Sequence, residues 1–278
     1  MFLDEILSKY PDIYIPDAVF KIQNVVDYLL SHLDTENNKL FPSSVFSFKL
    51  PFNKIAFEFT IQRFNGYHED VAILAREQNI NKSLSLLEVT YFVKVNFIKY
   101  LHLSIYYLLI DKNGNVVRWN EQYGKQIFPD RPEIRGNALM LIIPIDVKMS
   151  KDNNMSPASY SAGFNAVLGL ALNFLHCKNV HSIENPHQLI RAARRRGETT
   201  YFEKYYILQI EPMKKILNEQ GQAQTKGLKY ALHICRGHFK TYDRKGLFGK
   251  YKGNFWWSSM VKGDPTIGKI KKDYQINV

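Results

Sequence analysis

Cysteine is almost absent from this sequence, which has only Cys177 and Cys235 among its 278 residues. Two cysteines are too few for the disulfide framework that stabilises small secreted domains, and a free thiol is unusual in a secreted chain. The first residues also lack a signal peptide, because Asp4 and Glu5 come early and no basic segment followed by an apolar one is present. We therefore expect a protein of the reducing cytoplasm.

Long apolar runs are missing as well. The two most apolar segments, residues 101–110 and 166–175, have about half the roughly 20 residues that a membrane helix needs. Hydrophobic residues nevertheless make up 45% of the chain and aromatic residues 14%. This is enough for a sizeable core in one large domain or two small ones. The sequence predicts a globular protein without a membrane partner.

Acidic residues are scarce in the last third of the chain. Residues 185–278 contain 7 acidic residues (Asp and Glu) and 19 basic residues (Lys and Arg). Residues 1–184, by contrast, contain 19 acidic and 18 basic residues. The whole excess of positive charge thus lies in the C-terminal region, as expected when one module binds a polyanion. We expect a near-neutral scaffold domain over 1–184 and a basic C-terminal module over 185–278, either separate from the first domain or sharing its core.

Hydrophobic periodicity predicts the elements of both regions. In the first we expect helices over 2–10, 16–33 and 156–177, a hairpin of 45–50 and 55–61, one or two strands over 84–110 broken near Asn96, a turn at 111–114 and a strand over 138–145. In the second we expect a helix over 186–196 ending at Gly197, strands over 202–210, 229–241 and 253–261, a helical turn over 213–218 and a terminal strand ending at Ile276. The predicted fold class is α+β: helices plus antiparallel strands, with a basic C-terminal antiparallel sheet packed by one helix.

The densest polar cluster runs from His233 to Tyr242 and contains two imidazoles, a guanidinium, an ammonium and a phenol. In one uninterrupted strand, Arg236, His238 and Lys240 share a face, whereas a bulge at Gly237 would bring His238 to the face of His233. A histidine beside phosphate-binding cations suits metal-independent cleavage of RNA, whose 2′-hydroxyl can act as nucleophile. The candidate catalytic residues are His238, His233 and Tyr242; the alternative is a basic strand that contacts phosphates without reacting.

Metal chemistry is less well supported. Two-metal hydrolysis requires converging carboxylates, and the seven in the last third are scattered. A zinc site could be drawn from the ligand types His176, Cys177, His181, His233, Cys235 and His238, but their spacing fits no standard finger. We expect no metal and no cofactor.

Cations and aromatic residues alternate elsewhere in the C-terminal module. The run from Lys245 to Trp257 interleaves glycines, lysines and rings, which suits a surface that holds phosphates and stacks bases, although a hairpin loop explains the glycines equally well. Alternation puts Phe255 and Trp257 on one face and Trp256 on the other, so at least one tryptophan belongs to the core. The candidate nucleic-acid-binding residues are Arg191, Arg194, Arg195, Arg196, Arg236, Lys240, Lys250, Lys252, Phe255, Trp256, Trp257 and Lys262.

These features together resemble a group of uncharacterised phage and prophage proteins. The resemblance rests on Arg194 to Arg196, His233, Arg236 to Lys240, Trp256 or Trp257, Val261 and Gly263. It covers only the final third of the chain. It implies a mobile-element origin and a role in the cytoplasm of an infected host, and it carries no established activity.

Three hypotheses of function follow. The first is a phage-type nucleic-acid-binding protein, for RNA or DNA, that uses the basic, aromatic C-terminal face. The second is a metal-independent endoribonuclease with His238 as acid or base. The third is a host-protein inhibitor or counter-defence factor whose basic face covers an acidic partner.

Overall fold

The computed structural model describes residues 2–33, 47–62, 68–95, 99–117, 139–141, 157–186, 195–197, 200–202, 204–213, 215–216, 231–235, 237–258, 260–262 and 264–269. The chain divides into two compact units, one of residues 1–175 with 182–208 and one of residues 176–181 with 209–278. The expected domain boundary after residue 184 lies inside the first unit.

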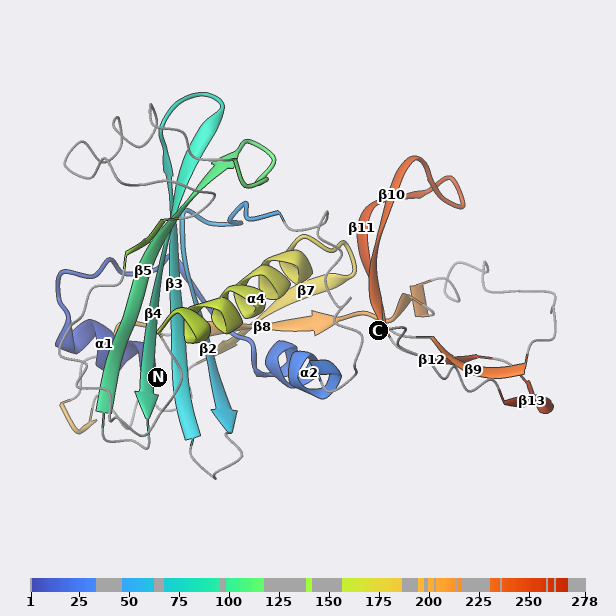
Figure 1. Cartoon of the computed structure of the whole chain (residues 1–278), viewed down its shortest axis with the longest axis horizontal. Coiled ribbons are helices and arrows are strands. Elements are labelled where there is room, and N and C mark those ends of the chain that lie inside the picture. Colours follow the sequence, from blue (N-terminus) through green and yellow to red (C-terminus); the bar gives the residue numbers. More distant parts are fainter. Residues whose placement is uncertain are drawn as a thin grey trace, which may run out of the picture. The chain divides into compact units, whose positions relative to one another are not determined.

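The first unit is built on a large mixed sheet with the strand order β6-β5-β4-β3-β2-β1-β8-β7 (Figure 1). Strand β1 is parallel to both β2 and β8, while the pairs from β2 to β6 are antiparallel. The strands are β1 (Ala18–Lys21), β2 (Lys54–Gln62), β3 (His68–Asn79), β4 (Leu84–Val95), β5 (Lys99–Asp111), β6 (Leu139–Leu141), β7 (Val180–Pro186) and β8 (Lys204–Ile210).

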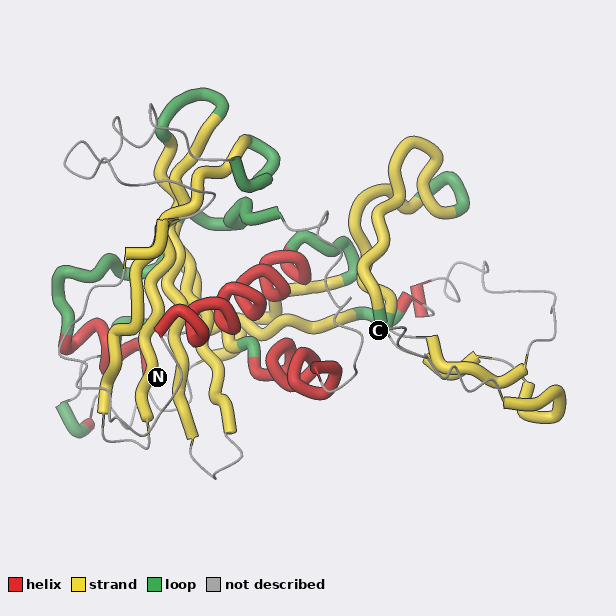
Figure 2. The backbone as a smooth tube through the Cα atoms, in the orientation of Figure 1, coloured by secondary structure: helices red, strands yellow, loops and turns green. Residues whose placement is uncertain are grey.

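Helices cover both faces of this sheet. On one face, Leu3 and Ile6 of α1 (Phe2–Lys9) pack against the cross-strand pair Ala56 and Leu74. On the other face, Phe164 of α4 (Pro157–Leu175) contacts the rings of Phe59 and Tyr91, and α2 (Gln23–Leu33) lies beside α4. The strands between these layers are therefore apolar on both sides. Figure 2 shows the helices and strands of the chain by colour.

Several predicted elements of the first unit are confirmed. Helices α1 and α4 form where periodicity placed them, and β4 and β5 are the predicted long strands. The turn after β5 is also present: Gly114 has a φ of 81°, and the Asp111 carboxylate accepts hydrogen bonds from the backbone N–H groups of Asn113 and Asn115. Local signals sufficed for these elements.

Two predictions in the same region are wrong. Residues 18–21 are strand β1 rather than the start of a helix, because Ala18, Val19 and Phe20 are all buried in a strand flanked on both sides. The hairpin expected around residues 51–53 is not formed, since β2 pairs with β1 and β3 and residues 47–50 are not a strand. The sequence pattern also failed to predict β3.

The second unit contains an antiparallel hairpin and a small separate sheet. The hairpin joins β10 (His238–Leu247) to β11 (Tyr251–Trp257). In the small sheet, β9 (Ala231–Cys235) lies between β12 (Met260–Lys262), which is antiparallel to it, and β13 (Asp264–Lys269), which is parallel. The predicted strand over 229–241 is therefore two strands, each in its own sheet, and the strand over 253–261 is also divided.

The helix expected over 186–196 falls mostly outside the described residues, and Pro186, where it was expected to start, is the last residue of β7. The helical turn after residue 212 is confirmed, since the Pro212 carbonyl accepts hydrogen bonds from the N–H groups of Lys215 and Ile216. Taken by its described elements, the chain is α+β with a preponderance of strands. No helix in its described part is both long and apolar enough to cross a membrane.

Candidate nucleic-acid interface

The base of the β10–β11 hairpin is buried on both faces. Phe255 and Trp256 are each 4% exposed, and they point to opposite sides of β11. On one side the Phe255 ring meets the rings of Tyr242 and Tyr251 edge to face, with centroids 5.8 and 6.1 Å away. On the other side the Trp256 ring lies 4.6 Å from Phe239. These contacts hold β10 and β11 to each other.

A buried amide fixes the outer edge of β11. The Asn179 side chain is fully buried; its Oδ1 accepts the N–H of Trp256 at 2.9 Å, and its Nδ2 donates to the carbonyls of Trp256 at 2.8 Å and Glu211 at 2.9 Å. The N–H of Lys178 donates to the carbonyl of Asn254 as well. Residues 177–179 thus run alongside β11 and satisfy backbone groups that would otherwise be buried without partners.

The opposite end of the hairpin, residues 243–250, is named the hairpin tip here, and it departs from regular pairing. Tyr242 is opposite Gly253 and Leu247 is opposite Tyr251. Between these two pairs β10 advances by five residues and β11 by two, so β10 has three extra residues. The extra residues bulge outward and expose Arg244 and Lys245. Gly246 closes the bulge with a φ of 66°, and a Cβ there would lie 2.9 Å from the Tyr251 carbonyl oxygen, so a side chain is excluded.

The turn that ends the hairpin tip is unusual because it contains an aromatic residue in the left-handed region. The N–H of Lys250 donates to the carbonyl of Leu247 at 3.1 Å, and Phe248 and Gly249 have φ values of 53° and 73°, as in a type I′ turn. The first of these positions favours Asn, Asp or Gly, and a side chain such as Phe costs on the order of 1–2 kcal/mol there. Phe248 is also 55% exposed.

Positive charge surrounds this turn. The exposed basic side chains of the hairpin are Lys240, Arg244, Lys245, Lys250 and Lys252, and the hairpin has one carboxylate, Asp243. Near the base, the Lys240 Nζ lies 5.1 Å from the centre of the Tyr242 ring, a cation–π contact. The side chain of Lys178 passes within 3.3 Å of the position that a Cβ of Gly253 would occupy. The hairpin is therefore a basic ribbon with an apolar ring at its end.

The predicted catalytic residues are distributed over two sheets. His238 is exposed at the start of β10, opposite Trp257, whereas His233 lies in β9, opposite Lys262. The Tyr242 hydroxyl is covered and has no hydrogen-bond partner among the described residues. The single strand that was one of the two expected arrangements is interrupted between Cys235 and His238, so His233 and His238 belong to different sheets.

The predicted binding residues fall into three groups. Lys240, Lys250 and Lys252 are exposed on the hairpin, and Lys262 is exposed on β12. Phe255 and Trp256 have their ring faces covered by packing, which leaves the partly exposed Trp257 of the three for stacking. Arg195 and Arg196 are exposed in the first unit, just before Gly197 with its φ of 73°, while Arg191, Arg194 and Arg236 lie outside the described residues.

The structure adds four residues that sequence reasoning missed: Arg244, Lys245, Phe248 and Asn179. The glycines at 246 and 249 indicate a hairpin loop, and the ring of Phe248 between them could have drawn attention to the tip. No local signal identifies Asn179, because its partners Glu211 and Trp256 are distant in the sequence.

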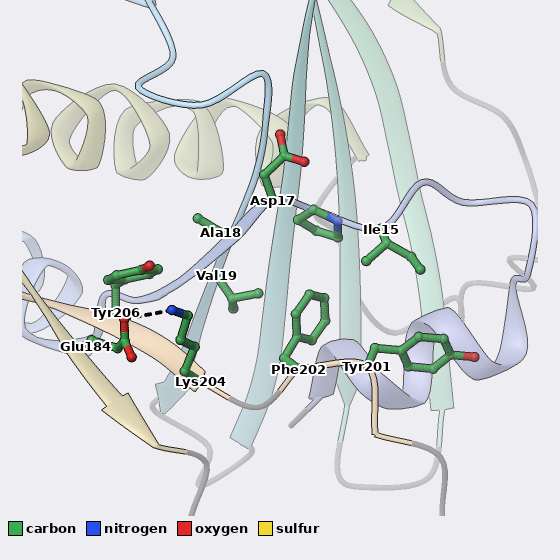
Figure 3. Close-up of a pocket in the computed structure, with 10 residues that line it drawn as sticks. Ile15, Asp17, Ala18, Val19, Glu184, Tyr201, Phe202, Lys204 and Tyr206 are labelled. Carbon is green, nitrogen blue, oxygen red and sulfur yellow. Dashed lines mark hydrogen bonds and ion pairs between the residues drawn. The ribbon is translucent and has the colours of Figure 1, made fainter.

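A second candidate site is an open pocket of about 610 Å³ in the first unit (Figure 3). It lies beside β1 and β8 and is lined by Ile15, Asp17, Glu184, Tyr201, Lys204 and Tyr206 among others. Its polar groups are engaged in the fold: Lys204 Nζ lies 2.8 Å from Glu184 Oε2, which raises the pKa of the lysine, and the Asp17 carboxylate accepts the N–H of Lys54. The pocket therefore offers no set of converging reactive groups among its described residues.

The thiol and imidazole groups considered for zinc are not grouped in the described part of the chain. No three His, Cys, Asp or Glu side chains gather there in a way that could hold a metal. Cys177 is buried, and burial raises the pKa of its thiol to about 12. His181 lies 3.6 Å from Glu211 at the surface.

Comparison with protein-family models, with curated proteins and with solved structures gives no match. The resemblance to phage proteins accordingly stays a prediction.

Proposed function

We propose that this protein binds nucleic acid through the β10–β11 hairpin. The observation that carries the proposal is the combination of five exposed cations, one carboxylate and one exposed aromatic ring on a ribbon whose base is fixed in the core. Lys and Arg side chains position a protein on phosphates, and a two-stranded β-ribbon has dimensions that a groove of a duplex admits. The cations and the ribbon both belong to the described part of the second unit.

The same surface suits an acidic protein less well. The centres of protein interfaces are depleted of lysine and enriched in aromatic residues that fill pockets. The exposed surface of the hairpin has lysines along both strands, and Phe248 is the one aromatic residue of the hairpin that is classed as exposed. A nucleic acid is therefore favoured over an acidic host protein as the partner of this surface.

Binding is also favoured over cleavage. A ribonuclease requires a second acid or base beside the first, and the predicted candidates come from different sheets, since His238 begins β10 and His233 lies in β9, while the Tyr242 hydroxyl is covered. His238 nevertheless lies on the same strand as Lys240 and is exposed. For this reason the experiment that tests binding also measures cleavage of the RNA on gels.

The test uses fluorescence anisotropy and gels with single-stranded RNA, single-stranded DNA and duplex DNA in EDTA. The triple variant Lys240→Gln, Lys250→Gln, Lys252→Gln should bind about 100-fold more weakly at moderate salt, since each phosphate contact contributes on the order of 1 kcal/mol through counterion release. The matched control Lys9→Gln, Lys82→Gln, Lys112→Gln changes three exposed lysines of the first unit by the same total charge and should lose only a few-fold.

Two outcomes would contradict the proposal. Equal losses in the two triple variants would mean that only net charge matters, and absence of binding to all three nucleic acids would direct the search to a protein partner. Shortened RNA that disappears with His238→Ala would instead identify the protein as a metal-independent endoribonuclease.

A further inference from the structure

We propose that Phe248 is a wedge that enters between two base pairs of a duplex and kinks it, with the hairpin serving as the arm that delivers the ring. This inference rests on the proposed nucleic-acid binding and specifies its ligand as double-stranded nucleic acid. Three independent features of the hairpin tip support it: the exposure of the ring, the strained backbone that holds it, and the charges beside it.

The ring has no structural role within the described part of the chain. Phe248 is the one large hydrophobic side chain of the second unit that is exposed there, at 55%, and no ring contact of its own is formed with another described residue. Scattered apolar side chains are common on surfaces, so exposure alone carries little weight. It becomes informative because Phe248 lies in the turn that joins β10 to β11, the ribbon drawn in Figure 1.

The backbone at Phe248 gives the second argument. Its φ of 53° is a conformation that favours Asn or Gly in a two-residue hairpin turn, and the following residue, Gly249, meets that preference. A turn selected for folding alone would have Asn or Gly at both positions. A strained residue that contributes no packing is the kind of outlier that is found where a side chain is needed for function.

Charge and reach give the third argument. Arg244, Lys245 and Lys250 are exposed on either side of the ring in sequence, so phosphates flanking an opened base step could be neutralised while the ring replaces lost stacking. Residues 177–179 run alongside β11 from Trp256 to Asn254, and the three residues between Asn254 and the turn, 251–253, span roughly 10 Å, which exceeds the depth of about 8 Å of either groove of B-DNA. The arm is therefore long enough to carry its tip to the base pairs.

A stacking platform for single strands is less consistent with this geometry. Such platforms present rings on an open sheet face along which successive bases lie. On this hairpin the rings at the base, Phe255 and Trp256, are covered, and the exposed ring of Phe248 is in the terminal turn rather than on a sheet face. A single ring in a turn can separate two stacked pairs but cannot support a row of bases.

The test compares wild type with Phe248→Asn, which suits the turn, Phe248→Trp, which keeps a wedge, and Phe52→Asn, which removes another exposed phenylalanine, in the first unit. A duplex with a donor and an acceptor dye at its ends reports bending, 2-aminopurine reports unstacking, and anisotropy reports affinity in the same samples. Wild type, Phe248→Trp and Phe52→Asn should kink the duplex by about 20–90°. Phe248→Asn should bind within about tenfold of wild type, because the phosphate contacts are kept, yet leave the duplex straight.

Each alternative result has a distinct meaning. If wild type binds the duplex without bending it, or Phe248→Asn bends it equally, the wedge is wrong while nucleic-acid binding stands. If 2-aminopurine responds to Phe248 only in single strands, the ring is a stacking platform and the wedge is again wrong. If no nucleic acid binds, the proposed function itself has failed. Because Phe248→Asn should raise the unfolding temperature, loss of bending cannot be attributed to misfolding when that rise is observed.

Discussion

Neutralising the hairpin cations one at a time should reduce the salt dependence of binding in regular steps. The variants are Lys240→Gln, Arg244→Gln, Lys245→Gln, Lys250→Gln and Lys252→Gln, and all five side chains are exposed. The logarithm of the binding constant falls with the logarithm of salt by about 0.9 for each phosphate neutralised on B-DNA. If all five cations contact phosphates, they contribute a slope near −4.5, which corresponds to a loss of about 500-fold between 50 and 200 mM salt.

Each single variant should therefore lower the magnitude of the slope by about 0.9, or about 3.5-fold in affinity over that range. The measurement is anisotropy of a labelled duplex at four or five salt concentrations, with protein folding checked at each. Lys112→Gln, an exposed lysine of the first unit, serves as the control and should leave the slope unchanged.

The reasoning fails if the slope is the same in all five hairpin variants and wild type. It also fails if Lys112→Gln lowers the slope as much as they do, since the charge would then act without a defined site.

Three further predictions concern the fold that supports this site. Asn179→Leu should expose the backbone of β11 to exchange, because three buried hydrogen bonds are lost at about 1–3 kcal/mol for each group left unpaired; hydrogen exchange at the Trp256 amide reports this, and unchanged protection there would contradict it. Burial raises the pKa of Glu58 above 4.5, so the folded state holds the proton more tightly than the unfolded state, and stability should fall as pH rises from 4.5 through the folded pKa. In urea unfolding, Glu58→Gln should be more stable than wild type at pH 7 and equal to it below pH 4. Lower stability of the variant at pH 7 would show that the carboxylate is needed. The Cys177 thiol, with a pKa near 12, should resist iodoacetamide at pH 8 in the folded protein and react in urea, as read by mass spectrometry; rapid labelling of the folded protein would show that the site opens.

The sequence allowed the elements with local signals to be predicted. Helix α4 has an apolar stripe and Pro157 at its start, and the β4–β5 pair ends in a turn with Asp111 and Gly114. The basic charge of the last third was likewise visible without a structure. These features depend on residues close to one another along the chain.

Features that depend on distant partners could not be predicted. Strand β1 looks helical by spacing, and becomes a strand because β2 and β8 flank it, the latter paired through Phe20 and Tyr206. The candidate site shows the same division. Composition indicated the lysines, but the interruption after Cys235, the burial of Trp256 and the strained turn at Phe248 follow from pairing and packing.

The anchor of the hairpin has a consequence for how this module can be inherited. Asn179 and its neighbours, which fix β11, lie between α4 and β7, whereas the hairpin begins at His238. The second unit is thus discontinuous in the gene product, and a fragment that starts at residue 209 would lack the side chain that ties Trp256 to Glu211. Recombination or engineering that moves the hairpin to another protein must therefore transfer both segments together, which ties the evolution of the arm to that of the sheet domain.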